Sequence, residues 1–326
     1  MRARYILPNY RIAIVGSGAL GGYYGAKLAY FGRDVHFLMR SDLAHVRRFG
    51  LRIRGSKEDV RLPKVNAHAS TEEIGPCDLV IVAVKTISNA HLVQLIPPLL
   101  HERTMLLTLQ NGLGNEAFLA KHFGAERVIG GLSFVCLNRV SPGVIEHYDV
   151  GRVVIGEYNG YPLPRTHDIA WEFKRSGVIC AVTSNLLQER WRKLIWNIPF
   201  NGLSVTAGGI DTAAILADDN LRAEVLALMD EVIAAANRCG YAIPTAEALT
   251  QIKRTQALGA YKPSTLIDYV AGRPLEIEAI WGEPLRAGVA AGAAMPRLAA
   301  LYERLREIDR QLRSGGRVEE TACRTS

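Results

Sequence analysis

The stretch RIAIVGSGALG, residues 11–21, decides the fold of this chain. An apolar run passes directly into the spacing Gly-x-Gly-x-x-Gly. A helix-compatible segment over residues 22–31 and a second apolar run over residues 35–39 follow. Strand, glycine-rich turn, helix and strand form the context in which this spacing holds the pyrophosphate of a dinucleotide. The alternative is a turn with a purely structural role, because glycine-rich turns are common.

The three glycines have different tasks in such a turn. Gly16 permits the tight turn, Gly18 lets the backbone approach the phosphates, and Gly21 lets the helix pack closely on the strand. The amides at the start of the helix then face the phosphates. We therefore expect a cofactor site made by Gly16, Ser17, Gly18, Ala19, Leu20 and Gly21.

The residue after the second strand distinguishes NAD from NADP. An NAD-binding chain usually carries Asp or Glu there, which binds the ribose 2′-hydroxyl. Here the position holds Arg40, followed by Ser41. A guanidinium and a hydroxyl suit the 2′-phosphate, so the sequence favours NADP(H). The alternative is a solvated surface arginine paired with Asp42.

The composition is that of a globular chain with room for two ordinary domains. Its 326 residues are 48% hydrophobic, and no apolar run approaches the ~20 residues of a membrane span. The segment before the first strand has no signal-peptide pattern, so we expect a cytoplasmic protein. The five cysteines are scattered without Cys-x-x-Cys, which indicates reduced thiols and no metal site.

The net charge of +7 comes from dispersed arginines, without a dense basic stripe interleaved with aromatic residues. Positive potential of this kind suits an anionic cofactor and substrate. We therefore expect small-molecule ligands, and neither nucleic acid nor a membrane as a partner.

The first half of the chain alternates strand-like and helix-like segments, as a Rossmann-type doubly wound parallel α/β sheet does. Residues 79–84 and 105–109 are continuous apolar runs, typical of strands covered on both faces. Later strand candidates lie at residues 128–131 and 153–155, and a loop is expected over residues 156–166.

Near residue 185 the pattern changes to a helical period, with alanine-rich helices up to about Arg313. We predict a Rossmann-type NADP-binding domain over residues 1–185. An all-helical substrate domain is predicted over residues 186–313, and a disordered tail over residues 314–326.

Polar residues follow two further predicted strands. Lys85 comes after residues 79–84, and Asn111 comes after residues 105–109, within the segment QNGLG. Ligands of open parallel sheets bind beyond the carboxyl ends of the strands, so these side chains predict a crevice shared with the glycine turn. The alternative is that each polar residue only marks where a buried strand reaches solvent.

The segment WRKLIWNIPFN, residues 191–201, carries polar residues at helical spacing. Lys193, Asn197 and Asn201 are four residues apart and share one face of a helix. The alternative is a solvated face, for which Asn is a poor choice because it lowers helix propensity.

All eight histidines lie between His36 and His167, so the helical half contains no histidine to donate a proton. Lys193 is the best candidate for an acid in that half, and Glu276 or Glu278 is available to tune it. Burial lowers the pKa of a lysine, whereas a neighbouring carboxylate raises it.

With these residues, the chain resembles the ketopantoate reductase (2-dehydropantoate 2-reductase) family over essentially its whole ordered length. The resemblance rests on the motifs above, on PSTLID over residues 263–268, and on EIE over residues 276–278. It implies the NADPH-dependent reduction of 2-dehydropantoate to (R)-pantoate, on the route to pantothenate and coenzyme A.

The resemblance also implies roles for the residues near the reacting carbonyl. Lys193 protonates the carbonyl oxygen as hydride reaches C2, and Glu276 orients the substrate and supports Lys193. Asn111 contacts the nicotinamide ribose and the substrate, and Lys85 lies in the cofactor crevice. The alternative for Glu276 is an exposed acid on a helix face.

The remaining implied roles concern the other end of the substrate. Asn197 and Asn201 hold the substrate hydroxyl, and Ser264 binds the carboxylate. Ser264 could instead serve only as a helix N-cap.

One departure bears on the substrate. The family usually continues from the glutamate with Ile-Asp-Tyr-x-Asn-Gly, whereas residues 277–282 read IEAIWG. Trp281 thus replaces a small polar residue. If it faces the pocket, a different branched 2-oxo acid is the substrate; if it faces the core, no change follows.

Three other functions stay open at this point. The first is reduction of another branched 2-oxo acid, and the second is a 3-hydroxyacid or 6-phosphogluconate-type dehydrogenase, which also pairs a Lys with an Asn. The third is an NADP-sensing protein without catalysis, although binding NADP alone needs none of the residues assigned to the substrate. Helical substrate domains often pair, so we expect a homodimer.

Overall fold

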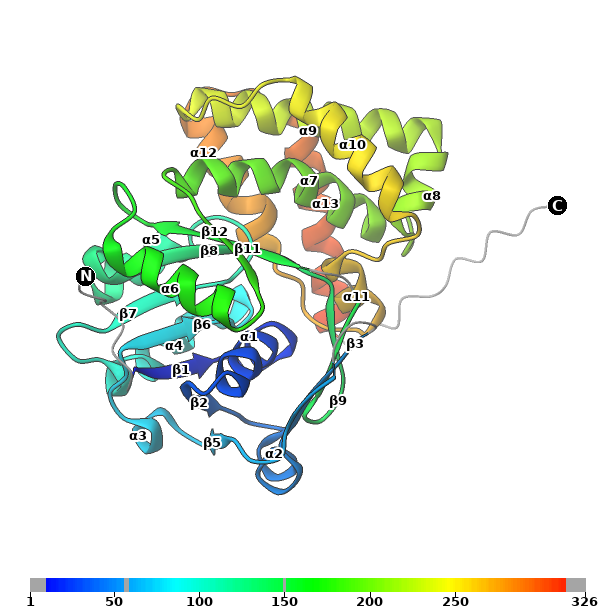
Figure 1. Cartoon of the computed structure of the whole chain (residues 1–326). Helices are drawn as coiled ribbons and strands as arrows, with labels where there is room; N and C mark the ends of the chain where they lie inside the picture. The colour runs from blue at the N-terminus through cyan, green and yellow to red at the C-terminus, as the bar shows by residue number, and fades with distance from the viewer. Residues whose placement is uncertain (1–9, 56–58, 149–150, 315–326) are drawn as a thin grey trace. The chain divides into compact units, whose positions relative to one another are not determined.

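The computed structural model describes residues 10–55, 59–148 and 151–314. These residues form two compact units (Figure 1). The sheet unit comprises the chain up to Asn111 together with Asn115–Leu186. The helical unit comprises Gly112–Gly114 and the chain from Leu187 onward. Apart from Ser314, the predicted tail lies outside the described residues.

An eight-stranded sheet organises the sheet unit, in the order β12-β11-β8-β7-β6-β1-β2-β5. The predicted α/β class with a parallel-dominated sheet is confirmed, because all neighbouring pairs except β8 and β11 are parallel. The strands are β1 (Arg11–Val15), β2 (Asp34–Leu38), β5 (Asn66–His68), β6 (Leu79–Val82), β7 (Met105–Thr108), β8 (Val128–Phe134), β11 (Arg152–Glu157) and β12 (Ile179–Val182).

Helices cover both faces of this sheet, and the strand residues alternate between two hydrophobic clusters. Ile12 and Ile14 of β1 belong to one cluster, with residues of α1 (Ala19–Tyr30) and α6 (Pro164–Arg175). Ala13 and Val15 belong to the other, with residues of α4 (Asn89–Leu95) and α5 (Asn115–Phe123). Burial on both faces explains why the central strands are continuous apolar runs.

A second, four-stranded sheet was not expected from the sequence. It has the order β4-β3-β10-β9, with β3 (Leu51–Gly55), β4 (Asp59–Leu62), β9 (Leu137–Ser141) and β10 (Val144–His147). Strands β9 and β10 form a hairpin between β8 and β11. Because no crossover helix joins β8 to β11, β11 returns antiparallel to β8.

Element ends differ from the predictions by a few residues. Helix α1 begins at Ala19, inside the glycine turn, where the sequence placed its start at residue 22. Strand β11 extends to Glu157 and α6 begins at Pro164, so the loop predicted over residues 156–166 is shorter.

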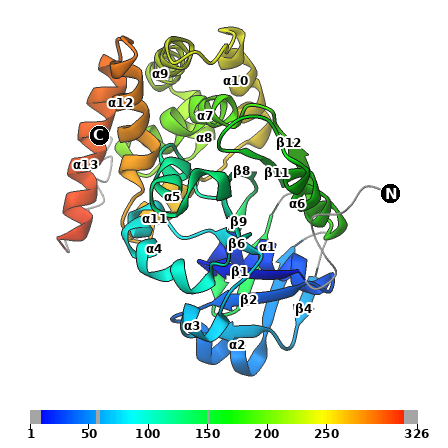
Figure 2. The same cartoon turned by 90° about the vertical axis from the view of Figure 1, so that its left-hand side faces the viewer.

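Helices build the helical unit, as the period of the sequence predicted. They are α7 (Leu186–Thr206), α8 (Thr212–Ala217), α9 (Asp219–Arg238), α10 (Ala246–Leu258), α11 (Ser264–Val270), α12 (Glu283–Ala290) and α13 (Pro296–Arg313). Helix α9 packs against α8, α10, α12 and α13 (Figure 1, Figure 2). A π-helical turn, η4 (Glu278–Gly282), runs directly into α12.

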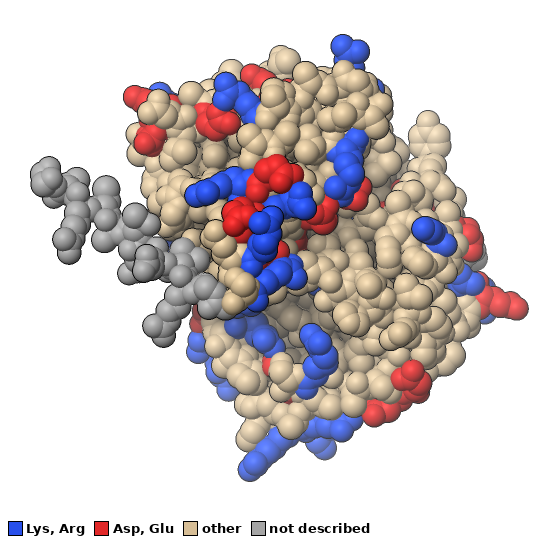
Figure 3. Space-filling model, turned by 180° about the vertical axis from the view of Figure 1, so that it is seen from behind, with Lys and Arg blue, Asp and Glu red and all other residues tan. Residues whose placement is uncertain are grey.

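Within the described residues, no helix is long and apolar enough to cross a bilayer. On the face shown in Figure 3, cationic and anionic side chains are interspersed among uncharged ones.

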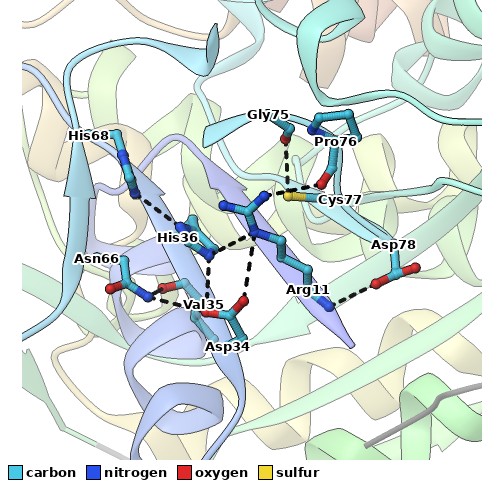
Figure 4. Close-up of polar contacts among 10 residues, drawn as sticks. All are labelled: Arg11, Asp34, Val35, His36, Asn66, His68, Gly75, Pro76, Cys77 and Asp78. Atoms are coloured by element: carbon cyan, nitrogen blue, oxygen red, sulfur yellow. Dashed lines mark hydrogen bonds and ion pairs between the residues drawn. The ribbon is translucent and has the colours of Figure 1, made fainter. Parts of the chain in front are cut away.

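A polar cluster lies on one face of the sheet around β1, β2 and β5 (Figure 4). Arg11 Nε donates to His36 Nε2 at 3.0 Å, and His36 Nδ1 lies 3.0 Å from His68 Nε2. These contacts link the guanidinium and the two imidazole rings in one row. Oδ1 of Asp34 lies 3.0 Å from His36 Nε2, and its Oδ2 lies 3.7 Å from Arg11 Nε, so the carboxylate balances the guanidinium.

This cluster favours a neutral His68. Burial lowers the pKa of His68 below its ordinary value of 6.5, and the neighbouring His36, Arg11 and Arg47 act in the same direction. Glu73, on α3 (Thr71–Ile74), opposes them.

We predict that the folding stability of the protein falls as the pH falls through about 6.5. The unfolded chain then binds a proton that folded His68 resists, so the free energy of unfolding decreases toward lower pH. Urea unfolding between about pH 8 and about pH 5.5 measures this loss, and His68→Gln should make it smaller. At the higher pH, the difference in the free energy of unfolding between the wild type and His68→Gln reports only the contacts that the substitution removes. An identical pH dependence in both would contradict the role of His68.

Candidate active site

The glycine turn has the geometry that a bound pyrophosphate requires. Gly16 has a φ of 103°, and a Cβ there would lie 2.4 Å from the Val84 amide nitrogen. A Cβ on Gly21 would lie 2.2 Å from the carbonyl oxygen of Gly16. At Gly18, by contrast, no heavy atom lies within 4 Å of a Cβ position. The first and third glycines thus serve the packing of the protein, and the second leaves open space for a ligand.

Helix α1 begins at this turn without a side-chain cap. Gly18 occupies the N-cap position, so the first amides of the helix can bind an anion. Ser17 is committed elsewhere, because its hydroxyl donates to the carbonyl oxygen of Leu38 at 2.9 Å. This bond ties the turn to the end of β2.

Arg40 follows β2 and is exposed. Its guanidinium has no hydrogen bond or ion pair with any residue that the structure describes. The alternative pairing with Asp42 is wrong, because Asp42 binds Arg139 at 2.7 Å and accepts the Ser41 hydroxyl at 2.9 Å. Arg40 is thus an exposed cation directly after β2, and the Ser41 hydroxyl beside it donates to Asp42.

A chain of amides fixes the loops after β6 and β7. Gln110 is 3% exposed and donates to the Val84 carbonyl oxygen at 2.9 Å and to Asn89 Oδ1 at 2.7 Å. Asn89 donates to Asn115, which in turn donates to the carbonyl oxygen of Asn111. Sequence reasoning missed Asn89 and Asn115, although polar residues at helix starts beside strand ends are a usable signal.

The structure places the glycine turn and the loops after β6 and β7 next to one another, as the sequence predicted. Val84, whose amide nitrogen adjoins Gly16, directly precedes Lys85, and its carbonyl oxygen binds Gln110, which precedes Asn111. Lys85 and Asn111 are both half-buried. The glycine turn and the two loops therefore share one rim.

Helix α7 of the helical unit carries the lysine and the two asparagines on one face. Leu194, Ile195 and Ile198 pack into the core. Asn197 is only 6% exposed, yet its side-chain amide has no hydrogen-bond partner among the described residues. Its amide atoms are not among the fully buried polar atoms that lack a partner in the described part of the chain, so they reach the surface and can bind a polar ligand.

Asn201 is instead committed within the protein. Its Nδ2 donates to the carbonyl oxygen of Asn197 at 3.0 Å, and its Oδ1 accepts from the Thr265 amide at 3.1 Å. The hydroxyl of Ser264 lies 3.5 Å from the same oxygen, and Ser264 is exposed. Pro263 holds the N-cap position of α11, so the alternative role of Ser264 as an N-cap is not observed. Asn201 thus joins α7 to the start of α11.

The pKa of Lys193 is lowered from its ordinary value of 10.5 to about 7. Desolvation of the ammonium is the main cause, and the neighbouring Arg190 adds to it. Glu276 acts in the opposite direction and raises the pKa. An amine with a pKa near neutrality can be both protonated and ready to release its proton.

Arg190 was missed by the sequence analysis. It lies one turn before Lys193 on α7 and is only 2% exposed. Arginines are rarely this buried, and nothing in the sequence around it separates it from the many surface arginines. Its spacing of three residues from Lys193 is the only signal present.

The two candidate glutamates have different environments. Glu276 is half-buried and acts on Lys193. Glu278 is exposed, and its carboxylate binds Arg286 at 2.8 Å and the Tyr302 hydroxyl at 2.7 Å. Of the two, only Glu276 is placed to tune the lysine.

Trp281 faces the core of the helical unit. Its side chain is fully buried, and its indole nitrogen donates to the carbonyl oxygen of Ile198 at 3.0 Å. The change of residue type at this position therefore gives no reason to expect a different substrate.

The cysteines do not form a reactive centre. Cys77, Cys136, Cys180 and Cys239 are free thiols, and burial raises the pKa of Cys77 and Cys180 to about 12. Cys323 lies outside the described residues. In the described part of the chain, no group of three or more His, Cys, Asp or Glu residues could hold a metal ion.

Known proteins resemble this chain over both units. The family model described as "Ketopantoate reductase PanE/ApbA" matches residues 12–160, and its "C terminal" counterpart matches residues 185–309. The 2-dehydropantoate 2-reductase of Nostoc sp. (strain PCC 7120) is 41% identical, over 94% of this chain and 97% of that protein. The enzyme of the same name from Mesorhizobium japonicum is 32% identical, over 83% of this chain and 89% of that protein.

A solved structure agrees with these relatives. The 2-dehydropantoate 2-reductase of Geobacter metallireducens GS-15 matches with a TM-score of 0.89 and 47% identity, over 91% of this chain and 99% of that one. Two family models and these relatives cover most of the chain, so this protein belongs to the ketopantoate reductase family of oxidoreductases.

Proposed function

We propose that this protein reduces 2-dehydropantoate to (R)-pantoate with NADPH, a step toward pantothenate and coenzyme A. One observation carries the proposal: helix α7 presents a lysine of pKa about 7 and, one turn later on the same face, the Asn197 amide, which is bonded to no other described residue and is open to a ligand. An acid and a hydroxyl-binding group on one face fit a 2-oxo acid that also carries a hydroxyl. The family relationship supports the same substrate.

The cofactor fits the residues of the sheet unit. The open space at Gly18, the uncapped start of α1 and the exposed Arg40 suit a pyrophosphate and a 2′-phosphate. When bound, NADPH supplies the hydride. Lys85 and Asn111 line the rim beside these groups and are assigned to the nicotinamide half.

Lys193 acts as the general acid. As negative charge develops on the C2 oxygen, the ammonium releases a proton to that oxygen, a contribution of ~10²–10⁴ in rate. Glu276 keeps Lys193 protonated against the effect of desolvation. Asn197 binds the substrate hydroxyl, Ser264 binds the carboxylate, and Asn201 holds the segment that carries Ser264.

The alternatives are less well supported. Family membership disfavours a 3-hydroxyacid or 6-phosphogluconate-type dehydrogenase and a catalytically silent sensor. The burial of Trp281 removes the reason to expect another branched 2-oxo acid. A cytoplasmic location and a homodimer stay predictions from the sequence.

We predict that kcat/KM for ketopantoate reduction falls as the pH rises through about 7, because only protonated Lys193 can donate. Lys193→Ala should lower kcat by ~10²–10⁴ and leave NADPH affinity nearly intact. The decrease of NADPH absorbance measures both, with pyruvate and 2-oxoisovalerate as competing substrates. Arg192→Ala is the control, since it removes a neighbouring cation of α7 that pairs with Glu189. A near-normal rate for Lys193→Ala would exclude this acid.

Arg40→Ala should weaken NADPH binding by about 10-fold to 100-fold, because a hydrogen bond to a charged group contributes ~1.5–3 kcal/mol. NADH binding should change little, since that cofactor has no 2′-phosphate. Fluorescence titration of both nucleotides gives the two affinities. Arg48→Ala, which removes an exposed cation from α2 (Leu43–Phe49), controls for net charge. Equal losses for NADPH and NADH would remove the assigned role of Arg40.

A further inference from the structure

The π-helical turn η4 lies two residues after Glu276 and contacts the catalytic helix α7. π-Helical turns are rare and are frequent at functional sites. The amide of Ile280 donates to the carbonyl oxygen of Glu276 at 3.3 Å, so the turn holds the backbone of that glutamate. The next residue, Trp281, donates its indole N–H to Ile198 at 3.0 Å.

The indole bond reaches α7 next to a position where the helix lacks one of its own backbone hydrogen bonds. Pro199 follows Ile198 and cannot donate to the carbonyl oxygen of Ile195, so one helical hydrogen bond is missing there. The helix nevertheless continues to Thr206. The acceptor of the indole bond, the Ile198 carbonyl oxygen, lies beside Asn197 and one to two turns after Lys193. It is also close to the helical hydrogen bond that Pro199 removes.

The loop Gly112–Gly114 also contacts η4. The amide of Leu113 donates to the carbonyl oxygen of Ala279 at 2.8 Å. Gly112 has a φ of 87°, and a Cβ there would lie 2.2 Å from the same oxygen. The loop therefore requires glycine to approach the turn, and η4 is hydrogen-bonded both to this loop and to α7.

We propose that Trp281 is a positioning residue for the reduction: its bond to Ile198 holds the segment of Glu276 in place against the helix that carries Lys193 and Asn197. Trp281 reaches the reaction only through Glu276 and α7. This inference rests on the proposed function, because it assigns the acid to Lys193.

Helix α7 also offers a matched control. Trp196 donates its indole N–H to the Thr255 hydroxyl at 2.9 Å, away from η4. Trp281→Phe and Trp196→Phe each remove one indole hydrogen bond of the helical unit. Only the first removes a bond between α7 and the segment of Glu276.

The test compares kcat, KM and the pH profile of the two variants with those of the wild type and Glu276→Gln. In Trp281→Phe we expect kcat to fall by roughly 10-fold to 100-fold, with NADPH affinity retained. Its alkaline limb should shift to lower pH, as in Glu276→Gln, because Glu276 raises the pKa of Lys193. Trp196→Phe should keep the wild-type profile. Equal profiles for the two Trp variants would overturn the proposal.

Two further measurements keep the test decisive. If Trp281→Phe does not fold, 3-benzothienylalanine at position 281 keeps the ring size and replaces only the N–H donor. If the wild type does not reduce ketopantoate, the proposed function fails on its own. The pH dependence of Lys193 acetylation by acetic anhydride, read by mass spectrometry, then decides the inference. A shift in Trp281→Phe but not in Trp196→Phe supports it, and no shift overturns it.

Discussion

The desolvation of the Lys193 ammonium is the constraint on which the candidate site of the helical unit depends. A cation taken out of water tends to lose its proton, and here the lowered pKa of about 7 brings a lysine into the range of a general acid. A carboxylate is needed to limit that shift, and Glu276 supplies it from a different segment of the chain. The hydrogen bond from the Trp281 indole to the Ile198 carbonyl oxygen joins η4, which follows Glu276, to α7, which carries Lys193.

The sheet unit meets a different requirement, namely the close approach of backbone to a charged ligand. Gly16 and Gly21 are demanded by contacts within the protein, whereas Gly18 leaves space outside it. The buried amide of Gln110 joins the loops after β6 and β7 through hydrogen bonds to Val84 and Asn89. Rigid amide contacts of this kind suit a site that binds a cofactor in one orientation.

The sequence predicted the main sheet well because its signals are local. An apolar run that ends in Gly-x-Gly-x-x-Gly defines β1 and the start of α1 within eleven residues. The second sheet was missed because β3 pairs with β10, which lies about ninety residues later in the chain. A short alternating strand such as LRIRG carries no information on so distant a partner.

The same division applies to the candidate site. The helical spacing of Lys193, Asn197 and Asn201 is readable in the sequence, because three side chains four residues apart must share a face. The sequence does not show which other residues surround each of these three side chains. Asn201 proves to be committed to Thr265, and Asn197 is left without a partner among the described residues. Whether a buried amide is satisfied depends on segments that meet it only in the folded chain.

The sequence by itself determined the α/β class with its helical second half, the glycine turn, and the candidate residues Arg40 and Lys193, because each follows from residue type and short-range spacing. Only the tertiary structure decided that Trp281 faces the core, that Arg190 is buried, and that Glu276 rather than Glu278 acts on Lys193. Burial and charge proximity are sums over neighbours that the chain brings together from afar, and no local pattern encodes those sums.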